Sequence, residues 1–219
     1  MKQALILFTR VPVQGKTKTR LQAALTPAQC VEVHCAFLQD LFAACNDPRW
    51  DLLVFYGQEG PLSILQELLP DQRQFFPQQG NSLGEKMDNA IAQTLAMGYD
   101  RCVLVGADLP ELHRGIIAAA MQSLDQSPLV LGPTVDGGYY LIGSRMRCSF
   151  VFAGQSYGGS TVFEQTMAAI KAAGYCCRTV QPLHDVDSPQ DLRALADRLR
   201  QQPAACAHSR QFLRRLGWM

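Results

Sequence analysis

The sequence predicts a three-layer α/β fold built on a mostly parallel sheet. Apolar runs typical of buried strands alternate with helical patterns through most of the chain, an order that favours strand–helix–strand units. The run from Cys102 to Val105 is apolar throughout, as is typical of a strand at the centre of a parallel sheet. We expect one domain over residues 1–203 and a C-terminal tail over residues 204–219, for which the sequence indicates no packing partner.

The expected elements follow from apolar spacing and from helix-start signals. Thr26, Ser82 and Ser188 each stand three residues before Gln, Glu or Asp, which predicts helix N-caps there. Strands are expected near residues 4–8, 52–56, 72–76, 101–105, 129–131, 139–142 and 175–180, with 139–142 antiparallel to its neighbour. Helices are expected near residues 27–46, 61–68, 82–98, 116–124, from the glycine-rich loop 154–160 to about 173, from 189 onward, and as a short basic helix from 208.

Composition excludes several classes of protein. The chain has 219 residues, 47% of them hydrophobic, so it is expected to fold rather than remain disordered. A net charge of +1 gives no overall field for nucleic acid or anionic lipid. No apolar run approaches the ~20 residues of a membrane span, and no signal peptide is recognisable. The eight cysteines contain no C-x-x-C pair, so we interpret them as reduced core residues of a cytoplasmic protein.

A basic loop follows the first expected strand. It places Arg10, Lys16, Lys18 and Arg20 around Gly15. Loops at the carboxyl ends of strands hold phosphates in open α/β sheets, and a glycine there lets the backbone approach the ligand. The alternative is a solvated basic loop with no ligand. A P-loop is not predicted, because the glycine required upstream of Gly15 is replaced by Arg10.

Acidic residues lie at the ends of three later strands. Asp108 follows the apolar strand, Asp136 precedes another strand, and Asp185 and Asp187 follow the last one. We expect Asp108 and one of the latter pair to hold Mg²⁺ or Mn²⁺ against nucleotide phosphates, since such cations prefer oxygen ligands. The alternatives are structural: Asp108 as a turn or cap residue, Asp136 as a turn residue, and Asp187 as an assistant to the Ser188 cap.

Five motifs occur together in order, and they carry a family resemblance. They cover residues 8–21 (Phe-Thr-Arg-x-Pro-x-x-Gly-Lys-x-Lys-Thr-Arg-Leu), 83–87 (Leu-Gly-Glu-Lys-Met), 106–112 (Gly-Ala-Asp-Leu-Pro-Glu-Leu), 131–143 (Leu-Gly-Pro-Thr-x-Asp-Gly-Gly-Tyr-Tyr-Leu-Ile-Gly) and 185–192 (Asp-Val-Asp-Ser-Pro-Gln-Asp-Leu). Over about residues 3–200 the chain resembles small bacterial glycosyltransferase A, or nucleotide-diphospho-sugar transferase, proteins. These are distant relatives of the 2-phospho-L-lactate and molybdenum cofactor guanylyltransferases.

The resemblance implies a Rossmann-like sheet with a nucleotide at its carboxyl edge. It implies catalytic roles for Lys18 and Asp108. The implied nucleotide-binding residues are Thr9, Arg10, Gly15, Lys16, Lys18, Arg20, Leu83 and Gly84. The implied acceptor-binding residues are Asp136, Gly137, Gly138 and Tyr139, and the implied metal ligands are Asp108, Asp185 and Asp187. The chain departs from its relatives at 156–161, where Ser-Tyr-Gly-Gly-Ser-Thr stands in place of Trp-Gly-Thr, and at Ala107, where relatives carry threonine.

The function expected from these residues is that of a Mg²⁺-dependent transferase. Its partners are expected to be a nucleoside triphosphate or nucleotide-sugar and a small-molecule acceptor. Four cations in the first loop favour a triphosphate, and hence nucleotidyl transfer, whereas the family description favours glycosyl transfer. The alternative is a nucleotide-binding regulator or scaffold without catalysis.

Overall fold

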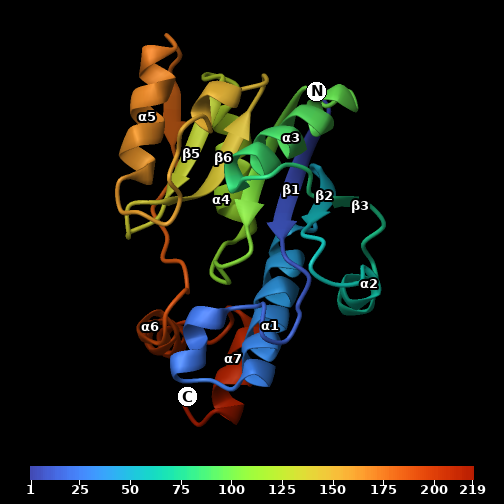
Figure 1. Ribbon diagram of the computed structural model, residues 1–219, viewed down its shortest axis with the longest axis vertical. Coiled ribbons are helices and arrows are strands. Elements are labelled where there is room, and N and C mark those ends of the chain that lie inside the picture. Colours follow the sequence, from blue (N-terminus) through green and yellow to red (C-terminus); the bar gives the residue numbers. More distant parts are fainter.

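The computed structural model describes all 219 residues and contains one seven-stranded sheet (Figure 1). The strand order is β3-β2-β1-β4-β6-β5-β7, and neighbouring strands are parallel except where β6 pairs with β4 and β5. The antiparallel strand expected near 139–142 and the edge strand expected near 72–76 are therefore confirmed. The strands are β1 (Gln3–Thr9), β2 (Asp51–Tyr56), β3 (Phe75–Pro77), β4 (Arg101–Gly106), β5 (Leu129–Pro133), β6 (Tyr139–Ser144) and β7 (Cys177–Thr179).

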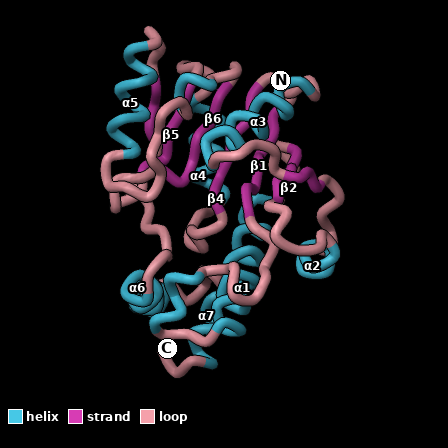
Figure 2. The backbone as a smooth tube through the Cα atoms, in the orientation of Figure 1, coloured by secondary structure: helices cyan, strands magenta, loops and turns pink.

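Helices cover both faces of this sheet and complete the three layers (Figure 2). One face packs against α1 (Pro27–Cys45), α2 (Ser63–Leu68) and α4 (Arg114–Ser123), and the other against α3 (Leu83–Ala96), the short helix η2 (Ser149–Val151) and α5 (Val162–Ala172). Strand β1 contributes side chains to the cores on both faces of the sheet, because successive side chains of a strand point to opposite faces. Leu5 and Leu7 lie in the first core, whereas Ala4 and Ile6 lie in the second. The predicted fold class is confirmed.

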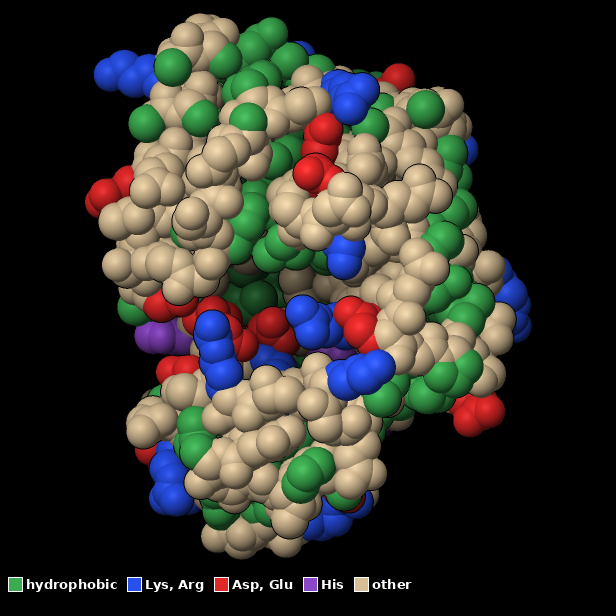
Figure 3. All heavy atoms as spheres, viewed as in Figure 1, with side chains coloured by type: hydrophobic (Ala, Val, Ile, Leu, Met, Phe, Trp, Pro, Cys, Tyr) green, Lys and Arg blue, Asp and Glu red, His purple; other side chains and the backbone are tan.

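A third core lies beyond the carboxyl ends of the strands. It joins the first part of α1 to the short helix η1 (Thr19–Ala23) and to α6 (Pro189–Gln201) and α7 (Ala207–Arg215). Figure 3 shows acidic and basic side chains gathered along a cleft that crosses the molecule between the sheet layers and these lower helices. The third core therefore forms the far wall of this cleft.

The C-terminal segment after residue 203 has a packing partner that the sequence did not indicate. Its basic helix forms as expected, and Phe212 and Leu213 are buried in the third core. Asp40 on α1 accepts hydrogen bonds from the backbone N–H groups of His208 and Ser209, at 2.9 and 2.8 Å. A carboxylate at this place satisfies free N–H groups at the start of α7.

Local signals in the sequence give most helix starts correctly. Thr26 and Ser188 form complete capping boxes, whereas at Ser82 only half of the box forms, because Glu85 accepts from the backbone of Asn81 instead. All eight cysteines are free. Four are buried, as expected of core residues, but Cys176 is exposed. No helix is long and apolar enough to cross a membrane.

Candidate active site

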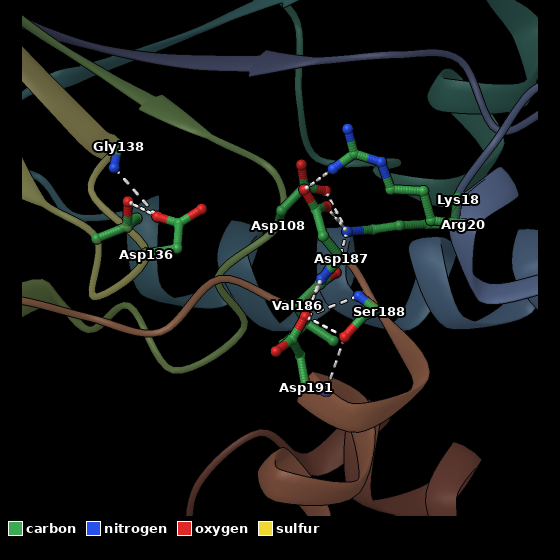
Figure 4. Close-up of polar contacts among 10 residues, drawn as sticks. Lys18, Arg20, Asp108, Asp136, Gly138, Val186, Asp187, Ser188 and Asp191 are labelled. Atoms are coloured by element: carbon green, nitrogen blue, oxygen red, sulfur yellow. Dashed lines mark hydrogen bonds and ion pairs between the residues drawn. The ribbon is translucent and has the colours of Figure 1, made fainter. Parts of the chain in front are cut away.

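Three segments meet at the carboxyl edge of the sheet. They are the basic loop after β1, the loop after β4 and the segment that enters α6. The backbone N–H of Val186 donates to the backbone oxygen of Asp108 at 3.0 Å, which fixes the last two segments together. Residues more than 160 positions apart in the sequence thus lie side by side, and Figure 4 shows Lys18, Arg20, Asp108 and Asp187 converging there.

Lys18 is the centre of this group. Its ammonium Nζ lies 2.7 Å from Asp108 Oδ1 and 3.4 Å from Asp187 Oδ1, and it also donates to the backbone oxygen of Val186. Its side chain is only 5% exposed, and Nζ lies 5.5 Å from the ring centre of Phe37. A cation so deeply placed requires anionic partners, which these carboxylates provide. Lys18 also has a left-handed backbone (φ 48°), a strained conformation typical of functional sites.

Asp108 remains accessible while it is held by this cation. Its side chain is 45% exposed towards the cleft. Burial opposes its ionisation, but the charge and hydrogen bond of Lys18 outweigh this and lower the pKa of the carboxyl below its usual value. His34, on α1, is buried behind the site, next to Thr9 and the backbone oxygen of Arg10. Burial lowers its pKa to about 4, so its imidazole is neutral at pH 7.

Asp187 faces the cations and leaves the helix cap to its neighbours. Its second carboxylate oxygen, Oδ2, accepts from Arg20 Nη1 at 3.2 Å, and the Arg20 side chain is 70% exposed. The capping box of α6 is closed by Ser188 and Asp191. The structural alternative considered for Asp187, assistance to the cap, is therefore limited to its backbone N–H, which donates to Asp191.

The four cations of the basic loop divide into two pairs. Lys18 and Arg20 face the acidic residues, whereas Arg10 and Lys16 face the loop after β2. Arg10 is 66% exposed, and its Nε lies 3.9 Å from Glu59 Oε1, while Lys16 Nζ lies 3.5 Å from the Glu59 backbone oxygen. Three of the cations are thus available to a ligand.

The other predicted nucleotide-binding residues differ in accessibility. Gly15 has a left-handed backbone (φ 77°) in open space, which is consistent with a glycine-dependent turn. Thr9 is buried, and its hydroxyl donates to the backbone of Arg10, so its side chain supports the loop from inside. Leu83 and Gly84 form the first turn of α3, where Leu83 is exposed and Gly84 is buried. No hydrogen bond or ion pair joins this turn to the Lys18 group.

The predicted acceptor-binding residues form a separate tight turn. Asp136 Oδ1 accepts from the hydroxyl of Thr134 and from the backbone N–H of Gly138, at 2.5 and 3.1 Å, and Figure 4 shows it apart from Lys18. These bonds correspond to the structural alternative for Asp136. Tyr139 packs edge-on against Tyr157, with ring centres 6.5 Å apart and hydroxyls 3.4 Å apart.

Gly137 has an internal reason to be glycine, which gives a stability prediction. Its φ is +95°, and a Cβ atom there would lie 1.9 Å from the backbone oxygen of Ser160. Gly137→Ala is expected to cost about 2–3 kcal/mol, from backbone strain and this clash. Gly174→Ala is the matched control, because Gly174 has φ +78° with nothing within 4 Å. Urea unfolding of both variants measures the difference, and equal losses would show that Ser160 moves aside freely.

The predicted metal ligands bring together carboxylates but no complete metal site. No group of three or more His, Cys, Asp or Glu side chains is placed to hold an ion, and the Lys18 ammonium lies between Asp108 and Asp187. Negatively charged side chains surround Asp185. Burial, followed by the charges of Asp136, Asp187 and Asp108, raises its pKa to about 6. Carboxylate oxygens suit a hard divalent cation, and such a cation would relieve this repulsion, so the donor set fits Mg²⁺ chemically.

The raised pKa of Asp185 predicts a pH-dependent stability in metal-free buffer. A carboxyl with a folded-state pKa of about 6, against a usual 3.8, binds its proton more tightly when folded. Its contribution to stability therefore falls as pH rises from about 4 to about 6 and stays low above that range. Asp185→Asn is expected to stabilise the chain by roughly 1–2 kcal/mol at pH 7.5, after allowance for solvent screening, and by less at pH 4.5. Thermal unfolding with EDTA tests this, with the exposed Asp71→Asn as control. A gain that is equal at both pH values would contradict it.

Two residues near the site were missed by sequence reasoning. Glu59 lies against Arg10 and Lys16, and Tyr157 lies against Tyr139. The sequence could have indicated Glu59 as a site residue, because it stands between Gly57 and Gly60 just after an expected strand. Asp108 has the same kind of position, just after another expected strand. Tyr157 had none, since its contact with Tyr139 depends on how the glycine-rich loop folds back over the turn.

The chain has the three-layer, Rossmann-like fold that is seen in nucleotide-diphospho-sugar transferases. It matches the crystal structure of a proposed nucleotide-diphospho-sugar transferase from Desulfovibrio desulfuricans, with TM-score 0.91 and 29% identity over 98% of this chain and 95% of that one. Residues 40–159 match the family described as "Uncharacterized protein conserved in bacteria (DUF2064)", and the chain belongs to this family.

More distant structures share the fold alone. A cytidylyltransferase from Leptospira borgpetersenii matches with TM-score 0.58 and 11% identity, over 99% of this chain and 95% of that one. A 4-diphosphocytidyl-2C-methyl-D-erythritol synthase from Anaerococcus prevotii matches with TM-score 0.61 and 8% identity, over 91% and 96%. No curated protein matches the chain.

Proposed function

We propose that this protein is a Mg²⁺-dependent transferase that uses a nucleotide substrate and a small-molecule acceptor. The observation that carries the proposal is the Lys18–Asp108–Asp187 group at the carboxyl edge of the sheet, bordered by exposed Arg10, Lys16 and Arg20. The name of the 29% identical structure, a proposed nucleotide-diphospho-sugar transferase, points to the same class of reaction. The proposal includes a cytoplasmic location and kinship with the 2-phospho-L-lactate and molybdenum cofactor guanylyltransferases.

Each group of residues has a part in the proposed reaction. Arg10, Lys16 and Arg20 would bind phosphate oxygens, which charged donors hold strongly. Asp108, Asp185 and Asp187 would hold Mg²⁺, which neutralises charge on the phosphates. Lys18 keeps Asp108 ionised and holds Asp108 and Asp187 in place until substrate arrives, and its ammonium can then stabilise charge on the departing phosphate group.

Nucleotidyl transfer is the reaction we favour within this class. In that reaction an acceptor oxygen attacks the α-phosphorus of a nucleoside triphosphate and pyrophosphate leaves. In glycosyl transfer the acceptor attacks the sugar of a nucleotide-sugar and a nucleoside diphosphate leaves. Three accessible cations beside Lys18 suit the larger charge of a triphosphate. The turn from Asp136 to Tyr139 would line the acceptor side, where Tyr139 and Tyr157 offer hydroxyls and aromatic edges.

Thermal unfolding with each nucleoside triphosphate and nucleotide-sugar, with and without Mg²⁺, tests the proposal. A ligand at ~100 times its Kd adds about 2.7 kcal/mol, which corresponds to a rise of roughly 5–10 °C in Tm for a chain of this size. We expect one triphosphate to give this rise only with Mg²⁺, and Arg10→Ala/Lys16→Ala to remove most of it. Lys171→Ala, on the exposed side of α5, is the control. No response to any nucleotide would contradict the proposal.

A further inference from the structure

An ion pair joins the loop after β4 to α6. Arg198 Nε donates to both carboxylate oxygens of Glu111, at 3.1 and 2.9 Å, and Arg198 Nη2 donates to Glu111 Oε2 at 2.6 Å. Both side chains are largely buried, with 27% of Arg198 and 15% of Glu111 exposed. Several hydrogen bonds from one planar guanidinium fix the orientation of a carboxylate as well as its distance. The pair therefore determines how the loop and the helix lie against each other.

The two partners belong to opposite walls of the cleft. Glu111 follows Asp108 by three residues, in a loop that is anchored to the sheet because Leu109 and Leu112 are buried in the first core. Arg198 lies on α6, which packs into the third core and lies below the carboxyl ends of the strands in Figure 1. The Glu111–Arg198 pair thus connects the sheet to the helices that face it across the cleft.

Helix α6 is attached to this loop at two separate points. At its start, the backbone N–H of Val186 donates to the backbone oxygen of Asp108 at 3.0 Å. Arg198 stands nine residues after Pro189, the first residue of the helix, which corresponds to about 14 Å along the helix axis. With the first contact alone the helix could pivot about Val186, whereas a second contact at this distance prevents the pivot. Asp187, next to Val186, is therefore held in a fixed place relative to Asp108.

The other contacts between these segments are less able to keep that spacing. Lys18 Nζ lies 2.7 Å from Asp108 Oδ1 and 3.4 Å from Asp187 Oδ1. A metal ion bound by both carboxylates would take the place of this ammonium, so Lys18 would not hold them once the ion is bound. Cys206 Sγ donates to a backbone oxygen of the loop after β4 at 3.0 Å, but a thiol is a weak donor. The ion pair to α6 is thus a strong side-chain contact that a bound metal ion would leave intact.

We propose that Glu111 and Arg198 are positioning residues, which hold Asp108 and Asp187 at the spacing that a divalent cation requires. The inference rests on the proposed function, in which these carboxylates bind the metal ion. One ligand comes from each wall of the cleft, so the coordination geometry depends on how the walls are held together. Mg²⁺ accepts little departure from octahedral geometry, and residues behind the ligands commonly affect metal affinity for this reason.

Arg198→Met tests this inference, because it removes the guanidinium but keeps most of the apolar stem. Binding of Mn²⁺ to the full chain is measured from the EPR signal of free Mn²⁺, and the variant is expected to bind about 10- to 100-fold more weakly than the native chain. Native-state hydrogen exchange in EDTA is the second readout. The amide of Val186 is expected to exchange at least ~10-fold faster in the variant, while that of Leu104 in β4 changes less. Arg200→Met removes the same charge from an exposed position on the same helix and is expected to change neither value by more than about twofold.

The direction of the change in affinity separates positioning from simple electrostatics. If Arg198 acts only through its charge, its loss would tighten Mn²⁺ binding, because a cation near the metal site is removed. Unchanged or tighter binding therefore overturns the inference, whatever the loss of stability. If Arg198→Met does not fold because Glu111 is left unpaired, the Arg198→Met/Glu111→Gln double variant gives the same two readouts without that charge.

Failure of the proposed function would give a different result. A native chain that binds no Mn²⁺ would contradict the metal site of the proposed function. Faster exchange at Val186 in the variant would then still support the role of the ion pair in holding α6 against the Asp108 loop. Unchanged exchange at Val186 overturns the positioning role in either case.

Discussion

Asp108→Asn is expected to lower kcat/KM by about 10³-fold or more while the chain stays folded. Asparagine has nearly the same size and its amide oxygen can still accept from Lys18, so the local packing is kept. The charge that Lys18 balances, and that Mg²⁺ would bind, is lost. Removal of one electrostatic group from an active site typically costs 10²–10³ in kcat, and loss of a metal ligand adds to this. Pyrophosphate release with the triphosphate that the binding screen identifies is the measurement.

Asp125→Asn is the matched control for this experiment. The Asp125 side chain is also 45% exposed and also pairs with a buried cation, Arg101, at 2.5 Å, but at the opposite end of the sheet. Its replacement is expected to leave kcat/KM within about twofold, although it costs some stability. If Asp108→Asn retained native turnover, Asp108 would have no part in catalysis. If the native chain bound nucleotide without any turnover, the non-catalytic alternative of a regulator or scaffold would be favoured.

The parts of the fold that sequence predicts well are those set by near neighbours in the chain. The apolar run of β4 identifies a central strand because both of its faces are buried. Thr26 and Ser188 identify helix starts because a cap is made within three residues. The same local rules indicated that 139–142 is a strand after a tight turn. Each of these features depends on few residues, so a pattern of residue types is sufficient.

The arrangement within the candidate site depends on contacts that such patterns do not contain. Residue types alone did not distinguish among the four cations of the basic loop, and only the family resemblance set Lys18 apart, whereas the structure buries Lys18 and leaves Arg10, Lys16 and Arg20 accessible. This difference arises because Lys18 contacts Asp187, which is 169 residues away in the sequence, at the edge of the third core. The helix of the tail was likewise expected, but its packing was not, since nothing near Phe212 in the sequence identifies α1 as its partner.

Phe212→Ala is expected to lower the free energy of unfolding by about 3–5 kcal/mol. It is also expected to destabilise the candidate site on the side that the third core forms. The Phe212 side chain is 1% exposed, and truncation of a buried phenylalanine leaves a cavity of this cost. The same core contains Phe37, whose ring lies under the Lys18 ammonium, and Val186, whose backbone oxygen binds that ammonium. The tail helix therefore belongs to the same core as the two residues that contact the Lys18 ammonium.

Urea unfolding gives the stability of the variant, and native-state hydrogen exchange locates the effect. Gln211→Ala, on the exposed side of the same helix, is the control and is expected to cost less than ~0.5 kcal/mol. The amide of Val186, which donates to Asp108, is expected to lose more protection than that of Leu104 in the central strand, because local opening follows the weakened core. A uniform loss of protection at both amides would mean that the third core and the sheet unfold as one unit. A stability loss below ~1 kcal/mol would mean that α7 contributes little to the wall of the cleft.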